Sequence, residues 1–193
     1  MSVDKANCFQ TPETRGKHIE NFQLCQQMIN DFSPILLKHL ETLNLSAPAP
    51  FPDSLKLINH FTQLNLTVDR TLLQAANYVH NIRLNNLSKQ LKTSDSEKML
   101  NLLHEISAQR QSLSNLDSTI TEFLNLTSNR KDKDMEFYLP YLAYTEKTLF
   151  ERIISFLMNM TMMCTFVIKH LEESNIYSNI QIKLSSNFYD SYN

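Results

Sequence analysis

The chain has 193 residues, of which 42% are hydrophobic, and a formal net charge of −2. This length suffices for one domain with a sizeable hydrophobic core. The near balance of charges gives no electrostatic reason to expect a nucleic acid or an anionic membrane as partner.

Glycine is nearly absent, because Gly16 is the only one in the chain. Average usage would place roughly a dozen glycines in this length. Tight hairpin turns, phosphate-cradling loops and dinucleotide-binding fingerprints all rely on glycine. The composition therefore predicts an all-α protein and argues against β-rich, P-loop and Rossmann folds.

The cysteines and the N-terminal residues bear on the cellular compartment. Cys8, Cys25 and Cys164 form no CxxC pair, and their odd number argues against a disulfide framework. Residues 1–13 are polar and lack both hydrophobic periodicity and the apolar core of a secretion signal, so we expect a mobile tail. These features predict an intracellular protein, located in the cytoplasm, on the cytoskeleton or spindle, or in the nucleus.

Hydrophobic periodicity predicts four helices, over residues 14–44, 53–91, 96–127 and 135–174. In the first helix, apolar residues recur at three- and four-residue steps from Phe22 to Leu43. Pro34 interrupts this pattern, and it either kinks the helix or lies in the first turn of a second helix capped by Ser33.

A proline-rich stretch separates the first two helices. Alternating prolines in residues 46–52 predict a stiff, extended linker. Asp53 or Ser54 can cap the second helix, whose apolar stripe extends from Ile58 to Ile82. Since only a short turn follows, the second and third helices are expected to form an antiparallel hairpin.

Four heptads define the third helix. Seven of their eight a and d positions are apolar, and the exception is Gln109, whose amide is able to hydrogen-bond across a seam and fix its register. The apolar surface is wide enough for a bundle of three or four helices. We predict that this seam binds partner helices through Met99, Leu102, Ile106, Gln109, Leu113, Leu116, Ile120 and Phe123.

The fourth helix carries two adjacent apolar seams. A helix that is apolar over so much of its girth must be covered on two sides. The other three helices can cover one seam, so we predict that one of two sets of residues faces another subunit. These sets are Phe156, Met160 and Met163, which we favour, and Ile154, Leu157 and Cys164.

The same helix raises the question of a membrane. No charged residue occurs from Ile153 to Ile168. This stretch is shorter than the ~20 residues that span a bilayer, so we interpret it as a buried helix and expect no membrane span. Residues 175–193 alternate apolar and polar and then become aromatic, and we interpret them as a loosely packed tail.

No constellation of residues indicates catalysis. The six histidines lack the spacing of a metal site, and each is interpreted as a surface or seam-edge residue. Cys164 is interpreted as a small hydrophobic residue. Glu146, Glu151 and the adjacent Glu172 and Glu173 are interpreted as solvated carboxylates near basic side chains. The sequence therefore predicts a protein that is not an enzyme and has no cofactor, metal or small-molecule substrate.

Together these patterns predict an elongated four-helix bundle or coiled coil with short disordered tails and one domain over residues 14–174. In general character the chain resembles the small coiled-coil subunits of spindle and kinetochore assemblies, such as the augmin complex. The resemblance implies a non-catalytic subunit whose partners are other helical subunits of a hetero-oligomeric complex. Subunits of vesicle-tethering or transcription-coactivator complexes have the same character.

Two further functions stay open at this point. One is a self-contained helical bundle whose groove binds a helix of a partner protein. The other is an enzyme whose site lies among the helices and leaves no signature in the sequence.

Overall fold

The computed structural model describes residues 12–43, 51–87, 93–128 and 135–190. These residues form four helices and no strand: α1 (Pro12–Thr42), α2 (Phe51–Leu87), α3 (Thr93–Ser128) and α4 (Met135–Asp190). The predicted all-α bundle is therefore confirmed. The predicted N-terminal tail up to residue 11, most of the proline-rich linker and the charged connection at 129–134 lie outside the described residues.

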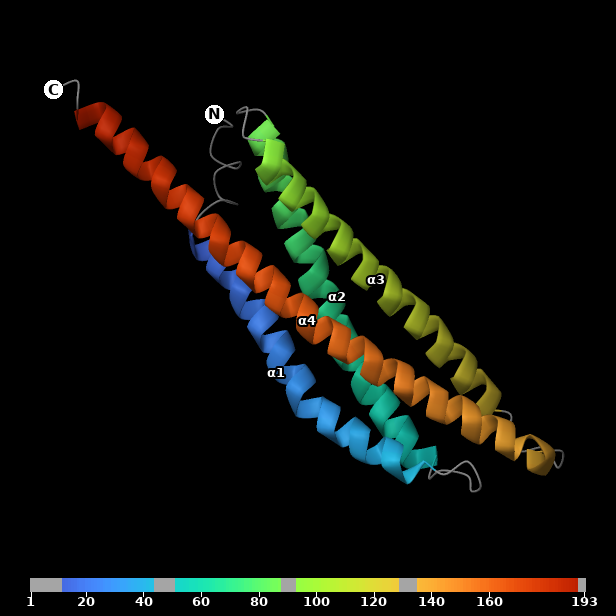
Figure 1. Ribbon diagram of the computed structural model, residues 1–193. Coiled ribbons are helices and arrows are strands. Elements are labelled where there is room, and N and C mark those ends of the chain that lie inside the picture. Colours follow the sequence, from blue (N-terminus) through green and yellow to red (C-terminus); the bar gives the residue numbers. More distant parts are fainter. Residues whose placement is uncertain (1–11, 44–50, 88–92, 129–134, 191–193) are drawn as a thin grey trace, which may run out of the picture.

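The four helices run alternately in opposite directions along one long axis (Figure 1). Among the described residues, α1 packs against α4 and α2, and α3 packs against α2 and α4. The pairs α1/α3 and α2/α4 are thus diagonally opposed, with no close approach of their backbones over the described ranges. This is the up-down-up-down arrangement that short connections between consecutive helices favour.

Each helix turns one apolar stripe towards the bundle axis. The stripe predicted for α1 is buried from Phe22 to Leu36, and the stripe of α2 is buried from Ile58 to Val79. Residues at these three- and four-residue steps share one side of an α-helix, so burying them removes a continuous apolar strip from water. Aromatic rings also meet across the diagonal, where Phe61 packs edge-on against Phe156 at a centroid distance of 6.3 Å. The core is therefore continuous along the bundle.

The helix bounds agree closely with the prediction except at the end of α4. Of the two alternatives at Pro34, the structure selects a continuous α1, which passes through this residue and bends in its second half (Figure 1). The stretch predicted to be a tail after residue 174 is instead helical, because α4 continues to Asp190. In Figure 1 this part of α4 extends beyond the other three helices.

Polar side chains on α2 and α3 fix how these helices lie against each other. The Arg110 guanidinium on α3 donates to the Asp69 carboxylate on α2, with 2.8 Å between Nε and Oδ1. The Asn65 amide on α2 donates to Asp117 on α3 at 3.2 Å. These contacts support the predicted hairpin and define its register. A hydrogen bond from Gln109, which is half-buried, stays a prediction.

Candidate functional site

The seam predicted on the third helix lies inside the bundle formed by this chain. All of its members are buried except Met99 and Gln109, which are half-buried; the buried ones are Leu102, Ile106, Leu113, Leu116, Ile120 and Phe123. In the closed bundle α2 and α4 cover α3. That this seam binds a partner stays a prediction, and such binding would require the chain's own helices to separate.

Both sets of residues singled out on the fourth helix are buried as well. In the first set, Phe156, Met160 and Met163 are each at most 6% exposed. In the second set, the same limit holds for Leu157 and Cys164. Ile154 in the second set is 8% exposed. The expectation that one set lacks cover within this chain is therefore wrong, because α1 lies along one side of α4 and α3 along the other.

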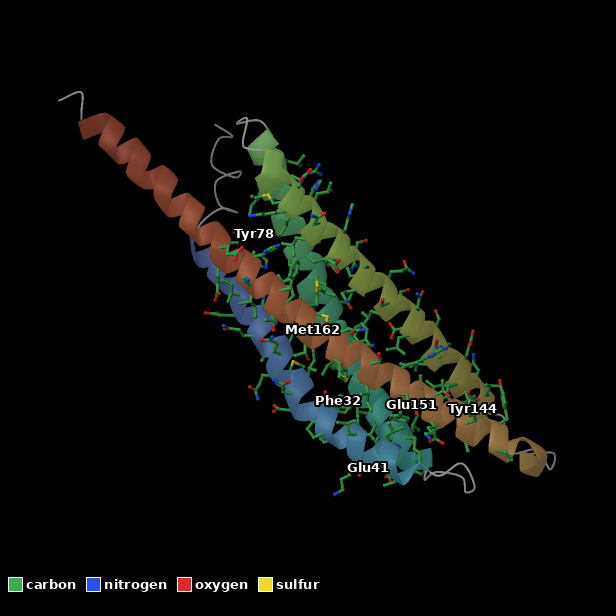
Figure 2. The ribbon with its side chains drawn as sticks, viewed as in Figure 1. Phe32, Glu41, Tyr78, Tyr144, Glu151 and Met162 are labelled. Carbon is green, nitrogen blue, oxygen red and sulfur yellow. The ribbon has the colours of Figure 1, made fainter. Side chains whose placement is uncertain are left out.

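The exposed apolar surface of α4 lies on its remaining side. Met158 is 65% exposed, Met162 is 72% exposed, and Phe166 follows four residues later with 37%. Ser155, Asn159 and Thr165 share this side and are also exposed. We call these six residues the α4 outer face. Tyr144, Glu151 and Met162, labelled in Figure 2, mark the exposed side of the helix from its first half to its middle.

The α4 outer face is also free of charge. Glu151 and Arg152 lie before it and Lys169 lies after it, and no ionised side chain occurs between Ile153 and Ile168. An exposed strip that combines large apolar side chains with an absence of charge is typical of a protein interaction surface. Methionine suits such a surface because its flexible thioether chain adapts to different partners.

By length and composition alone, α4 is apolar enough to cross a membrane over Pro140–Glu173. Less than half of its most apolar window, 44%, is buried inside the bundle. A core helix of a water-soluble bundle has the same composition, because it too is covered by apolar neighbours. In this structure α1 and α3 cover the buried part of this window, and the rest of it is exposed.

A polar cluster, which the sequence did not lead us to expect, lies in the core near the end of α1. Ser54 is fully buried, Glu146 is 1% exposed and His39 is 9% exposed. The Ser54 hydroxyl donates to Oε1 of Glu146, and Nε2 of His39 lies 2.8 Å from the same hydroxyl oxygen. The His39 ring also meets Phe150 edge-on. Three helices thus contribute one polar residue each.

The direction of these hydrogen bonds sets the tautomer of His39. A serine hydroxyl has one proton, and here it is donated to Glu146. The Ser54 oxygen must therefore accept from His39, which places a proton on Nε2. Burial lowers the pKa of His39 from its ordinary value, while the charges of Glu146 and Asp53 act in the opposite direction. The neutral imidazole with Nε2 protonated satisfies this geometry.

This cluster does not have the geometry of a nucleophilic triad. In such a triad the histidine lies between the serine and the carboxylate and takes the hydroxyl proton. Here Ser54 lies in the middle, donates to the carboxylate and is closed off from solvent. What the arrangement does is satisfy a buried carboxylate and join three helices.

The interpretation of Glu146 as a solvated carboxylate is therefore wrong. Of the two alternatives for His39, a surface position and a seam edge, its burial excludes the surface position. The apolar periodicity of α4 already indicated that Glu146 is buried. Glu146 lies four residues after Leu142 and four before Phe150, so it falls on the buried stripe of α4. Polar residues in register with an apolar stripe point towards the core whenever the stripe does.

Two cysteines lie in the core, one on each of two neighbouring helices. Cys25 on α1 and Cys164 on α4 are both buried, with reduced thiols. Burial raises the pKa of Cys164 to about 12, with a further contribution from neighbouring Cys25, and burial also raises the pKa of Cys25. The Cys25 thiol donates to the Thr71 hydroxyl at 3.6 Å. Such thiols are poor nucleophiles, which agrees with the interpretation of Cys164 as a hydrophobic residue.

Within the described ranges, no three histidine, cysteine, aspartate or glutamate side chains lie close enough together to hold a metal ion. No family model matches the chain, and comparisons with curated proteins and with solved structures give no significant match.

Proposed function

We propose that this protein is a non-catalytic helical subunit of a multiprotein assembly and that the α4 outer face is the surface that binds its partner. The observation that supports the proposal is the exposure of Met158, Met162 and Phe166 on one charge-free side of α4. These positions follow one another at four-residue steps, so they lie on the same side of the helix and form a slightly slanted strip along it. An amphipathic helix of a partner would bury such a strip.

The closed core favours a particular form of this proposal. Because the chain covers its own seams, binding does not require an open bundle and adds a partner helix to the outside. This form is close to the alternative of a self-contained bundle that binds a helix. A finer assignment, to a spindle or kinetochore assembly of the augmin type, rests only on the general character of a glycine-poor chain of long helices.

The test replaces both exposed methionines by glutamate, in the double variant Met158→Glu and Met162→Glu. Two charges would have to be desolvated at the interface, so we expect partner binding to fall at least about a hundredfold. The matched control is Ser114→Glu with Ser118→Glu, which adds the same charges at the same spacing on the exposed side of α3. Proteins co-purified with each variant would be identified by mass spectrometry, and circular dichroism would verify folding.

The proposal requires a set of proteins that the parent and the α3 control both retain and the α4 variant loses. If the parent, the α3 control and the α4 variant all retained the same set, the α4 outer face would be excluded as the binding surface. A parent chain that behaves as a monomer and retains no protein reproducibly would contradict the assembly role. For the finer assignment, a fluorescently tagged chain should concentrate on spindle microtubules or kinetochores, and a uniform distribution through mitosis would contradict it.

A further inference from the structure

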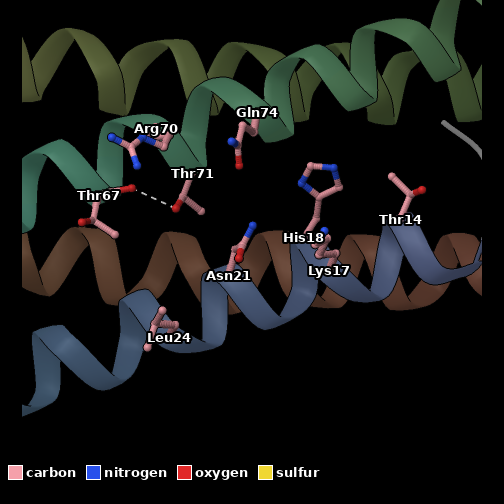
Figure 3. A pocket seen from close by; sticks show the side chains of 9 residues that line it. All are labelled: Thr14, Lys17, His18, Asn21, Leu24, Thr67, Arg70, Thr71 and Gln74. Carbon is pink, nitrogen blue, oxygen red and sulfur yellow. Dashed lines mark hydrogen bonds between the residues drawn. The ribbon is translucent and has the colours of Figure 1, made fainter.

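A groove of about 500 Å³ lies between α1 and α2, lined mainly by polar residues. Its two cationic residues, Lys17 and Arg70, lie towards opposite ends of it (Figure 3). Cations so placed do not converge on one anionic group. A mainly polar lining is also not a surface that the apolar side of a helix would bury. The pattern that points to a specific partner lies on α4 instead.

The exposed side of α4 carries a heptad pattern of its own, apart from the two buried seams. Glu151 and Met162 mark this side in Figure 2. Alternating four- and three-residue steps keep residues on one side of a helix, and two helices of a coiled coil pack along such a line. We call the exposed residues at these steps the outer seam: Glu151, Ser155, Met158, Met162, Thr165 and Lys169.

The outer seam has the same kinds of side chain in both directions along the helix, except that its end charges are opposite. About a midpoint at residue 160, the two methionines occupy equivalent positions, and so do Ser155 and Thr165. Glu151 and Lys169 are likewise equally far from this midpoint. A two-fold axis through the midpoint would pair two antiparallel copies of α4, with equivalent positions opposite each other. Methionine then meets methionine, a hydroxyl residue meets a hydroxyl residue, and an acid meets a base.

The two end charges favour the antiparallel arrangement over the parallel one. Glu151 and Lys169 are exposed, and neither forms an ion pair within the described part of the chain. In the antiparallel pair, Glu151 of each copy lies opposite Lys169 of the other, so an attractive contact forms at each end of the apolar strip. A parallel pair would instead place acid against acid and base against base, which disfavours it.

The length of α4 is a second, independent reason for the same arrangement. The part of α4 after residue 174 extends beyond the other three helices (Figure 1). Near the other end of α4, Tyr141 is 58% exposed and Tyr144 is 61% exposed. Tyr144 lies 16 residues before the midpoint, so it is level with position 176 of the second copy, within the projecting part. The projecting end of each α4 therefore lies along the exposed tyrosines of the other copy.

We propose that the partner bound by the α4 outer face is a second copy of this chain, and that two bundles associate through α4 in an antiparallel pair with two-fold symmetry. This inference rests on the proposed function, because it names the partner of the same surface. A two-fold contact uses the same patch on both chains, so one self-complementary helix is sufficient to form it. Phe166 of one copy is nearly level with Ser155 of the other, whose small side chain leaves room for the ring.

The first test is sedimentation equilibrium of the purified full chain over a range of concentrations. We expect a reversible equilibrium between monomer and dimer. The double variant Met158→Glu with Met162→Glu should weaken the dimer about a hundredfold or more, because four carboxylates would meet at the contact. The α3 control, Ser114→Glu with Ser118→Glu, should dimerise as the parent does.

The second test reverses the end charges and so examines the antiparallel register. Glu151→Lys places base against base at both ends of the strip, and Lys169→Glu places acid against acid. Each should weaken the dimer about tenfold or more, because two attractive contacts become repulsive. Combining both substitutions restores opposite charges, so the affinity should return close to that of the parent. Glu20→Lys, at an exposed position of α1, is the matched control and should leave the dimer unchanged.

A parent chain that stays monomeric at the highest concentration overturns the second copy as partner. The proposed function still stands in that case if other proteins co-purify with the parent and are lost from the α4 variant. A dimer that the methionine variant retains lies on another surface and also overturns the inference. A dimer that needs the methionines but does not respond to charge reversal overturns the antiparallel register. Circular dichroism would verify that each variant is folded.

Discussion

Ser54 on α2 donates a hydrogen bond to the Glu146 carboxylate on α4, so two diagonally opposed helices are joined inside the core. Within the ranges that the structure describes, the backbones of α2 and α4 do not approach each other closely. The side chains reach across the bundle axis, and His39 of α1 completes the contact. A buried carboxylate is tolerated here because a donor is provided for it. This relationship leads to the first two predictions.

Removing the hydroxyl group of Ser54 should destabilise the bundle. In Ser54→Ala the Glu146 carboxylate and the His39 Nε2–H both lose their partner, and we expect the free energy of unfolding to fall by about 1–3 kcal/mol. Urea denaturation followed by circular dichroism measures the change. Ser155→Ala, at an exposed position of α4, should change stability by less than about 0.5 kcal/mol. Equal effects of the two substitutions would mean that the buried contact contributes nothing.

Stability should depend on pH through the histidines. Burial lowers the pKa of His39, and likewise of His18 and His170, in the folded state. The unfolded chain therefore protonates these histidines more readily than the folded chain does. Their contribution to the free energy of unfolding is fully present above about pH 6.5, and it is lost as the pH falls from that value towards the lowered pKa. The urea midpoint should be lower at about pH 5.5 than at about pH 7.5.

The contribution of His39 can be separated from that of the other two histidines. In His39→Gln one titrating group is lost while an N–H donor for Ser54 is retained. The decline in urea midpoint between the two pH values should therefore become smaller. A steeper decline, or a higher midpoint at the lower pH, would contradict the assigned direction of the pKa shift.

A charge placed in the α3 seam should unfold much of the protein. Leu113 is 4% exposed in the core, so Leu113→Asp buries an unpaired carboxylate and leaves a gap where the leucine packed. We expect a loss of more than about 3 kcal/mol in the free energy of unfolding. Ser114→Asp, at the exposed neighbouring position, is the matched control. Equal melting curves of the two variants would show that the side of α3 that carries Leu113 is not the buried side.

The thiols of the core should resist modification. With a pKa of about 12, Cys164 has almost no thiolate near pH 8, and the pKa of Cys25 is raised as well. In a Cys8→Ser background, both should react slowly with a thiol reagent in buffer and rapidly in concentrated urea. Rapid reaction in buffer, with the native circular dichroism spectrum retained, would mean that the helices around these cysteines open readily.

The sequence by itself determined the helices and the side of each that is buried. The repeat of apolar residues in α1, α2 and α3 follows from backbone geometry, which brings residues three and four apart to one side. The scarcity of glycine excluded folds that depend on tight turns, because such turns require backbone conformations that glycine adopts most readily. The end of α4 escaped prediction, because the alternation after residue 174 resembles a strand and the structure is helical there.

Only the tertiary structure decided what covers each buried side and which distant residues meet. Periodicity shows that an apolar stripe must be covered. It does not show by what, because a helix of the same chain and a helix of a partner would cover the stripe equally well. For this reason, the two seams of α4 could not be assigned to their neighbours in advance. Ser54 and Glu146 are 92 residues apart in the sequence, and their contact depends on how four helices are arranged. The groove beside Arg70 and the exposure of Met162 likewise result from the spacing and rotation of packed helices, which are properties of the assembled bundle.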